Sequence, residues 1–166
     1  MRFSTLLILS FKTQSFKIIK MEIKEDGFIF SDDNNLVDVK AIHNYLNTQS
    51  YWAKGIPLET VQKSIANSLC FGVYKDGKQA GFARWVTDRA TFAYLCDVYI
   101  EEEYRGLGLS KKLISLMMFH NDLQGLRTYC LATLDAHGLY AQFGFKPVGT
   151  PDKLMEIRVP NIYENM

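Results

Sequence analysis

The segment VYIEEEYRGLGLS, residues 98–110, joins two patterns that belong to different kinds of secondary structure. The stretch Thr91–Ile100 is rich in aromatic and β-branched residues, which is typical of a central β-strand. The stretch Leu109–His120 places apolar residues at helical spacing, namely Leu109, Leu113, Leu116 and Met117. The sequence therefore predicts a strand, a glycine-bearing loop and an amphipathic helix in immediate succession.

The loop between these two elements has the properties of an anion-binding site. Gly106 and Gly108 allow the backbone to turn tightly and to approach a ligand closely. The first amides of the following helix lack partners within the helix, and the helix dipole makes this end positive. Arg105 adds a fixed positive charge. Together these features predict a phosphate cradle across residues 105–110.

Other phosphate-binding loops fit the segment less well. A P-loop needs Lys-Ser or Lys-Thr directly after its second glycine, and this loop lacks that pair. A dinucleotide-binding fingerprint needs a third glycine where Lys111 stands, and an acidic residue about twenty positions on, where Cys130 and Leu131 stand. A glycine turn with a purely structural role stays open as an alternative.

Elsewhere, hydrophobic spacing and turn residues predict the rest of a mixed sheet. Asp76-Gly77 is a tight-turn signal between two runs with strand character, which indicates an antiparallel hairpin. We expect strands at Gly27–Ser31, Leu69–Tyr74, Gln79–Val86, Thr91–Ile100, Arg127–Thr133 and Lys153–Val159, and helices at Leu36–Asn47, Leu58–Ser68, Leu109–His120 and His137–Phe143. The predicted fold class is α/β (α+β), a single domain with a mixed, largely antiparallel sheet flanked by helices.

Length, charge and cysteine content exclude several classes of protein. A chain of 166 residues is large enough to bury the core of one domain. The net charge of +1 supplies no basic field for nucleic acid, and no apolar run reaches the roughly 18 residues that a membrane helix needs. Three widely separated cysteines suggest neither a disulfide framework nor a metal site: Cys70, Cys96 and Cys130. We therefore expect a cytoplasmic protein with no metal, no nucleic-acid partner and no membrane partner.

The first twenty residues have no clear place in this pattern. They resemble a very short signal peptide, but no small-residue cleavage site follows them. We expect residues 1–20 to be an N-terminal extension of uncertain role and residues 21–166 to form the functional domain.

Two separate segments resemble motifs of the GNAT superfamily of N-acetyltransferases. The family's pyrophosphate motif has three defined positions: Gln or Arg first, Gly three residues later, and Gly or Ala two residues after that. In this chain these positions are occupied by Arg105, Gly108 and Ser110. Ser110 departs from the usual final Gly or Ala, but it is small and its amide stays available. The run Ala136–Phe145 is similar to the family's Ala, Tyr and Gly-Phe segment. The resemblance covers about Leu69–Arg158 and implies the acyl-CoA N-acyltransferase fold.

The resemblance also implies an activity and a set of binding residues. The activity would be N-acetyltransferase, moving an acetyl group from acetyl-CoA to a primary amine of an unidentified small molecule or peptide by direct attack. Acetyl-CoA would be a co-substrate, with its pantetheine amides on the backbone of the central strand and its pyrophosphate on the glycine loop. The implied binding residues are Val98, Ile100, Arg105, Gly106, Leu107, Gly108, Leu109, Ser110 and Thr133.

Two residues are candidates for catalysis. By the resemblance Tyr140 lies beside the thioester sulfur, where a phenol can donate a proton as the sulfur gains charge, although a packed aromatic is the alternative. Asp97 is the titratable residue closest to the reaction end of the central strand and a candidate general base. Asp97 could instead hold the loop, and a water chain could deprotonate the amine.

The acceptor and the assembly stay open. Tyr51, Trp52 and Trp85 offer aromatic surface that could receive an apolar or cationic amine. A different class of function, a non-catalytic acyl-CoA-binding or sensing module, would keep the loop without a competent base. The sequence leaves the oligomeric state undetermined, with a homodimer as the commonest assembly.

Overall fold

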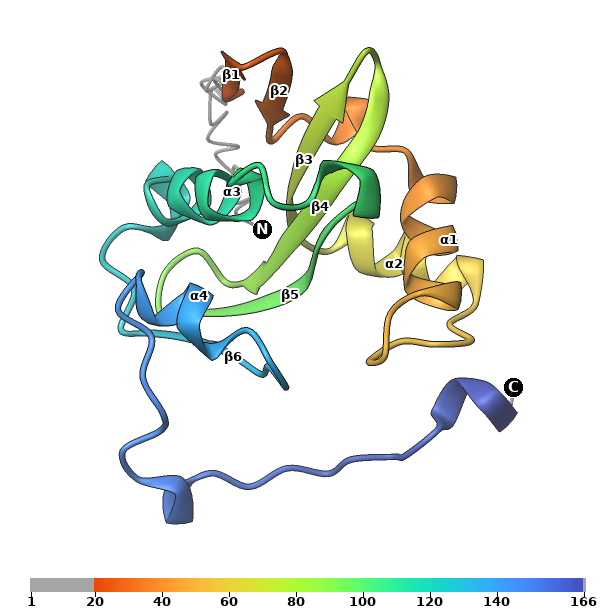
Figure 1. Cartoon of the computed structure of the whole chain (residues 1–166). Coiled ribbons are helices and arrows are strands. Elements are labelled where there is room, and N and C mark those ends of the chain that lie inside the picture. Colours follow the sequence, from red (N-terminus) through yellow and green to blue (C-terminus); the bar gives the residue numbers. More distant parts are fainter. Residues whose placement is uncertain (1–19, 166) are drawn as a thin grey trace, which may run out of the picture.

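A six-stranded sheet organises residues 20–165, the part of the chain that this computed structural model describes (Figure 1). The strand order β1-β2-β3-β4-β5-β6 follows the sequence. Each neighbouring pair is antiparallel up to β5, whereas β5 and β6 are parallel because α3 crosses over between them. The strands are β1 (Glu22–Glu25), β2 (Phe28–Ser31), β3 (Leu69–Lys75), β4 (Lys78–Thr87), β5 (Phe92–Ile100) and β6 (Thr128–Leu131). The predicted fold class, a mixed and largely antiparallel sheet flanked by helices, is confirmed.

Helices cover both faces of this sheet (Figure 1). The helices are α1 (Val39–Thr48), α2 (Leu58–Ala66), α3 (Leu109–Met118) and α4 (His137–Ala141). Side chains alternate along each strand, so Phe71 packs in the cluster with α3 while the adjacent Cys70 packs in the cluster with α1 and α2. No helix within residues 20–165 is long and apolar enough to cross a membrane. The expected extension at residues 1–20 lies, apart from Lys20, outside the described residues.

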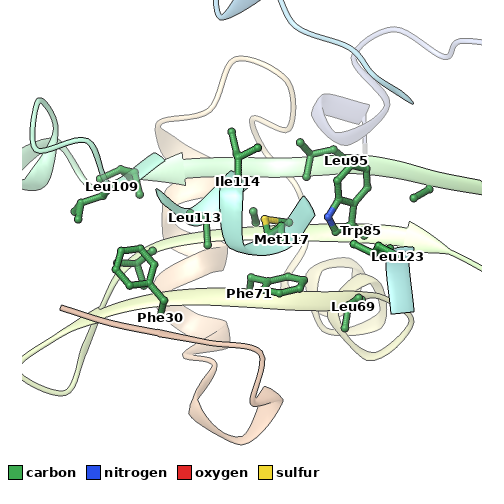
Figure 2. Packing of buried hydrophobic residues seen from close by; sticks show 14 of the residues in the cluster. Phe30, Leu69, Phe71, Trp85, Leu95, Leu109, Leu113, Ile114, Met117 and Leu123 are labelled. Carbon is green, nitrogen blue, oxygen red and sulfur yellow. The ribbon is translucent and has the colours of Figure 1, made fainter. Parts of the chain in front are cut away.

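The main core forms between α3 and the sheet (Figure 2). Leu113, Ile114 and Met117 recur at helical spacing and are completely buried against β3, β4 and β5. Trp85 of β4 is also completely buried in this cluster. Trp85 is therefore part of the core, and the expectation that it contributes to an acceptor surface is wrong.

The first helix begins three residues later than its hydrophobic spacing predicts. Asp38 caps α1 by accepting hydrogen bonds from the amides of Lys40 and Ala41, both at 3.0 Å. Asp33, the earlier capping candidate, instead caps a short 3-10 turn at Asn34–Leu36. Two competing caps thus divide the segment that the sequence predicts as one helix.

Both ends of the described chain differ from the predicted strands. The strand β1 has no counterpart in the prediction because charged residues occupy three of its four positions. It pairs with β2 across a turn in which Asp26 and Gly27 have positive φ angles of 50° and 75°. The strand predicted at Lys153–Val159 is absent from the structure, in which a 3-10 turn at Pro151–Lys153 precedes a segment paired with no other strand.

Candidate active site

The free edge of β5 is the framework of the candidate site. β4 pairs with β5 as far as Ile100, whereas β6 pairs with it only from Phe92 to Leu95. Beyond Leu95 the two parallel strands therefore diverge, and no described strand takes the place of β6. Backbone polar groups on this side of residues 96–100 thus have no partner strand, and a ligand can pair with those that no side chain occupies.

A β-bulge lies within this free stretch. Phe82 pairs with Tyr99 and Arg84 pairs with Cys96, so two residues of β5, Asp97 and Val98, stand opposite Ala83 alone. Asp97 has a positive φ of 54°, which few residues other than glycine adopt without strain. The bulge bends the strand and alters its direction at the divergence from β6.

The side chain of Asp97 is held by partners from two distant segments. One carboxylate oxygen accepts a hydrogen bond from Arg84 Nε at 2.6 Å, and the other accepts one from Trp52 Nε1 at 3.0 Å. The Arg84 and Asp97 side chains are only 15% and 10% exposed, so this ion pair is largely removed from water. Arg84 also donates to Ser68 Oγ at 3.1 Å. The sequence analysis did not identify Arg84. The available signal was a charged residue between the apolar residues Ala83 and Trp85 of a predicted strand.

The glycine loop has the backbone conformation that close approach to an anion requires. Gly106 and Gly108 have φ angles of 79° and 77°, in the left-handed region that favours glycine. Gly108 caps α3, and the first amide bonded within the helix is that of Lys112, which donates to the Gly108 carbonyl at 3.1 Å. The preceding helix amides, at residues 109–111, lack intrahelical partners and face the loop. A Cβ added at either glycine would meet nothing within 4 Å, so the space beside the loop is open.

Arg105 ties this loop to the end of β5. Its Nε donates to the Ile100 carbonyl at 3.1 Å, and its Nη2 donates to Tyr45 Oη at 3.2 Å. The Glu101 amide donates to Ala80 of the neighbouring chain segment, so the Ile100 carbonyl of the same peptide unit points toward the free edge. Arg105 thus holds both the loop and the edge in place.

A cleft of about 890 Å³ joins the free edge, the loop and α4. It is lined by almost every residue that the sequence predicts for the site: Asp97, Val98, Ile100, Arg105, Gly106, Gly108, Leu109, Ser110, Thr133 and Tyr140. Leu107 differs from these residues, because it lines a smaller pocket on the other side of the loop and its side chain is exposed. The structure therefore brings the predicted residues together, with the exception of Leu107.

Tyr140 occupies the α4 wall of the cleft. Its side chain is buried and meets the ring of Phe145 edge to face, with centroids 6.1 Å apart. Burial, with smaller contributions from Tyr51 and Asp135, raises the pKa of Tyr140 to about 12. The phenol therefore keeps its proton throughout the neutral range and acts there as a hydrogen-bond donor.

Two loops approach each other beside α4. The hydroxyl of Tyr51, from the α1–α2 loop, accepts a hydrogen bond from the Leu134 amide at 3.1 Å. Thr133 accepts one from the Ala136 amide at 3.0 Å, which shapes the turn before α4. Cys96 also lines the cleft, but burial raises the pKa of its thiol to about 11, so it stays protonated rather than acting as a nucleophile. No cluster suited to a metal ion occurs within residues 20–165.

The part of the chain that forms this cleft resembles known proteins. The family model "Acetyltransferase (GNAT) domain" matches residues 66–147, which contain the free edge, the loop and α4. One similar protein of known crystal structure comes from Xanthomonas campestris pv. campestris and is provisionally described as an acetyltransferase of the GNAT family. It shares 53% sequence identity with this chain. That match covers 82% of this chain and 96% of the other, with a TM-score of 0.80.

Two further relatives are more distant. The Gibberella zeae protein FG08082, whose name carries a provisional acetyltransferase assignment, is 29% identical over 137 aligned positions, and the match covers 69% of this chain and 76% of that protein. A predicted acetyltransferase from Clostridium acetobutylicum, whose crystal structure is described with acetyl-CoA, covers 74% of this chain and 92% of its own. Its identity of 14% and TM-score of 0.52 indicate a likeness of fold alone. On the strength of the Xanthomonas relative and the family model together, this chain belongs to the GNAT family of acetyltransferases.

Proposed function

We propose that this protein is an N-acetyltransferase that moves an acetyl group from acetyl-CoA to a primary amine of a small molecule or peptide by direct attack. The observation that carries the proposal is one cleft that combines a free strand edge, a helix N-terminus behind two left-handed glycines and a buried phenol. Membership of the GNAT family supports acetyl-CoA as the donor, as does the Clostridium relative described with that compound.

The loop and the strand edge would bind the two polar parts of the donor. The open space beside Gly106 and Gly108 and the amides of residues 109–111 suit the pyrophosphate. The backbone of Val98 and Ile100, on the free edge of β5, suits the pantetheine amides. When bound, acetyl-CoA supplies the activated acetyl group as a thioester.

Tyr140 would stabilise the departing thiolate by donating a hydrogen bond. A thiol has a pKa of about 8.5 in a cysteine side chain, well below the pKa of about 12 that Tyr140 has here. A full proton transfer to sulfur would therefore be unfavourable unless water returns the proton to the phenol. We infer that the hydrogen bond itself carries most of the effect of Tyr140 on the rate.

Asp97 would act mainly by positioning. Both of its carboxylate oxygens already accept hydrogen bonds, one from Arg84 and one from Trp52. An amine would have to displace one of these donors before Asp97 could take its proton directly. We therefore propose that water removes the amine proton, while Asp97 holds Trp52 at the cleft wall and neutralises Arg84.

The activity itself can be tested by measuring thiol release. We expect acetyl-CoA to release free thiol in the presence of at least one member of a panel of aliphatic amines, polyamines, amino acids and peptides, with mass spectrometry detecting the acetylated product. Saturable binding of acetyl-CoA without amine-dependent thiol release across the panel would support a non-catalytic acyl-CoA-binding module instead.

Gly108→Glu is expected to abolish CoA binding measured by calorimetry, because it adds bulk and negative charge where the phosphates approach. Gly125→Glu is the matched control, since Gly125 has the same φ of 77° and the same open surroundings but does not line the cleft. The control should retain wild-type affinity. Equal CoA affinities for the folded Gly108→Glu variant and the control would contradict the assignment of the loop.

Tyr140→Phe is expected to slow single-turnover acetyl transfer on the order of a hundredfold while changing acetyl-CoA affinity little. The substitution keeps the packed ring and removes only the donor. Tyr74→Phe is the control, because the hydroxyl of Tyr74 is also buried but lies on β3, away from the cleft lining. Identical single-turnover rates for Tyr140→Phe and wild type would mean that Tyr140 only packs.

Asp97→Asn is expected to destabilise the fold by roughly 3 kcal/mol, because Arg84 would be left as a largely buried charge without an anionic partner. Thermal or denaturant unfolding measures this loss, and Arg84→Gln/Asp97→Asn should recover part of it. Single-turnover acetyl transfer at saturating substrates should fall less than tenfold. A fall of a hundredfold or more without loss of stability would instead identify Asp97 as the general base.

A further inference from the structure

The turn before α4 is held by hydrogen bonds on both sides of Asp135. The Leu134 amide donates to the hydroxyl of Tyr51 at 3.1 Å, and the Ala136 amide donates to Thr133 Oγ1 at 3.0 Å. The backbone at Asp135 is therefore fixed relative to both the α1–α2 loop and α4. A polar group on a turn that is already ordered binds a ligand without the cost of ordering the turn.

The side chain of Asp135 presents a free negative charge to the cleft. It is exposed and belongs to the cleft lining. Its carboxylate has no hydrogen-bond or ion-pair partner within residues 20–165. Asp135 also helps to raise the pKa of the Tyr140 phenol, behind the larger effect of burial. A carboxylate without a partner thus lies near the phenol that we place beside the departing thiolate.

The other charges of the cleft are compensated or act elsewhere. The residues that carry them are Asp97, Arg105 and Arg158. Asp97 is neutralised by Arg84, and Arg105 is bonded to the end of β5 and to α1. Arg158 acts on Tyr94 together with Glu156, so two opposite charges meet there. Asp135 is therefore the charged residue of the cleft lining that acts on Tyr140.

Two aromatic rings beside this turn offer their faces to the same cleft. Tyr51 is 57% exposed and Trp52 is 39% exposed, and their ring centroids are 5.0 Å apart. Their polar ends are already engaged, since the Tyr51 hydroxyl accepts from the Leu134 amide and Trp52 Nε1 donates to Asp97. Ring faces attract cations and pack against carbon chains. A carboxylate beside two such rings is a combination suited to a cationic ligand.

We propose that Asp135 binds the amino group of the acceptor, and that the protein accepts primary amines that have no carboxylate beside the amino group. An aliphatic amine has a pKa near the value of about 10.4 found for lysine, so it reaches the cleft as an ammonium ion. Asp135 accepts a charge-assisted hydrogen bond from this ion. A carboxylate on the adjacent carbon would bring a second negative charge toward Asp135. This assignment rests on the proposed acetyl transfer and adds a substrate class to it.

A matched pair of acceptors tests the substrate class. Isopentylamine and the free amino acid leucine differ only in the carboxylate beside the amino group. We expect wild-type protein to acetylate isopentylamine with a kcat/KM at least about tenfold higher than that for leucine. Asp135→Asn is expected to raise the KM for isopentylamine about tenfold, to change kcat less than about threefold, and to remove most of the preference over leucine.

Two further variants separate the charge of Asp135 from a structural effect. Asp135→Glu keeps the carboxylate and should retain most of the preference for isopentylamine. Glu59→Gln is the matched control, because Glu59 is an exposed carboxylate on α2 that does not line the cleft. The control should leave the KM for both acceptors unchanged.

Binding of the amine can also be measured without turnover, in the complex with CoA, which has no acetyl group. Isopentylamine is expected to shift the amide NMR signals of residues 133–136, and Asp135→Asn should weaken this binding on the order of tenfold. Such binding without thiol release would contradict the proposed acetyl transfer and still support the role of Asp135. The role of Asp135 is overturned if the wild-type complex does not bind isopentylamine, if Asp135→Asn binds it equally well, or if leucine is the better acceptor.

Discussion

The divergence of β5 from β6 is the constraint on which the candidate site depends. β5 keeps β4 as a partner from Ala93 to Ile100, apart from the bulge at Asp97 and Val98, but loses β6 after Leu95. The strand is therefore rigid enough to hold a ligand on one side and has unpaired backbone groups to offer on the other. The glycine loop and α3 follow directly after the same strand, so the free edge and the helix N-terminus lie in one cleft.

Long-range side-chain hydrogen bonds then determine the shape of this cleft. Trp52 and Tyr51, from the α1–α2 loop, bond respectively to Asp97 on β5 and to the Leu134 amide after β6. Arg105 joins the glycine loop to Tyr45 on α1. The α1–α2 region thus contacts β5, the segment after β6 and the glycine loop.

The same divergence that frees β5 for a ligand leaves β6 as a short edge strand. Among the described strands only β5 pairs with its four residues, and the core beside them is partly exposed. The free stretch of β5 therefore suits a ligand that binds along the strand. Both features arise because the parallel pairing of β5 and β6 is limited to four residues on each strand.

The sequence by itself was sufficient to predict the elements whose signals are local. The Asp76-Gly77 turn, the apolar stripe of α3 and the two glycines before it all appear in the structure where the sequence predicts them. These features depend on turn conformation and on side-chain spacing within a few residues, so neighbouring residues contain the necessary information. The predicted residues Tyr140 and Gly108 likewise line one cleft.

Only the tertiary structure determined the hydrogen-bond partners of Asp97, the burial of Trp85 and whether the last predicted strand forms. The partners of Asp97 are 13 and 45 residues away in the sequence, and a bulge in β5 turns its side chain toward them. Trp85 looks the same in the sequence whether it is exposed or buried, and its burial depends on which face of β4 meets α3. The segment Leu154–Val159 has the pattern of a strand, but a strand exists only when a partner supplies its hydrogen bonds, and the described part of the chain supplies none.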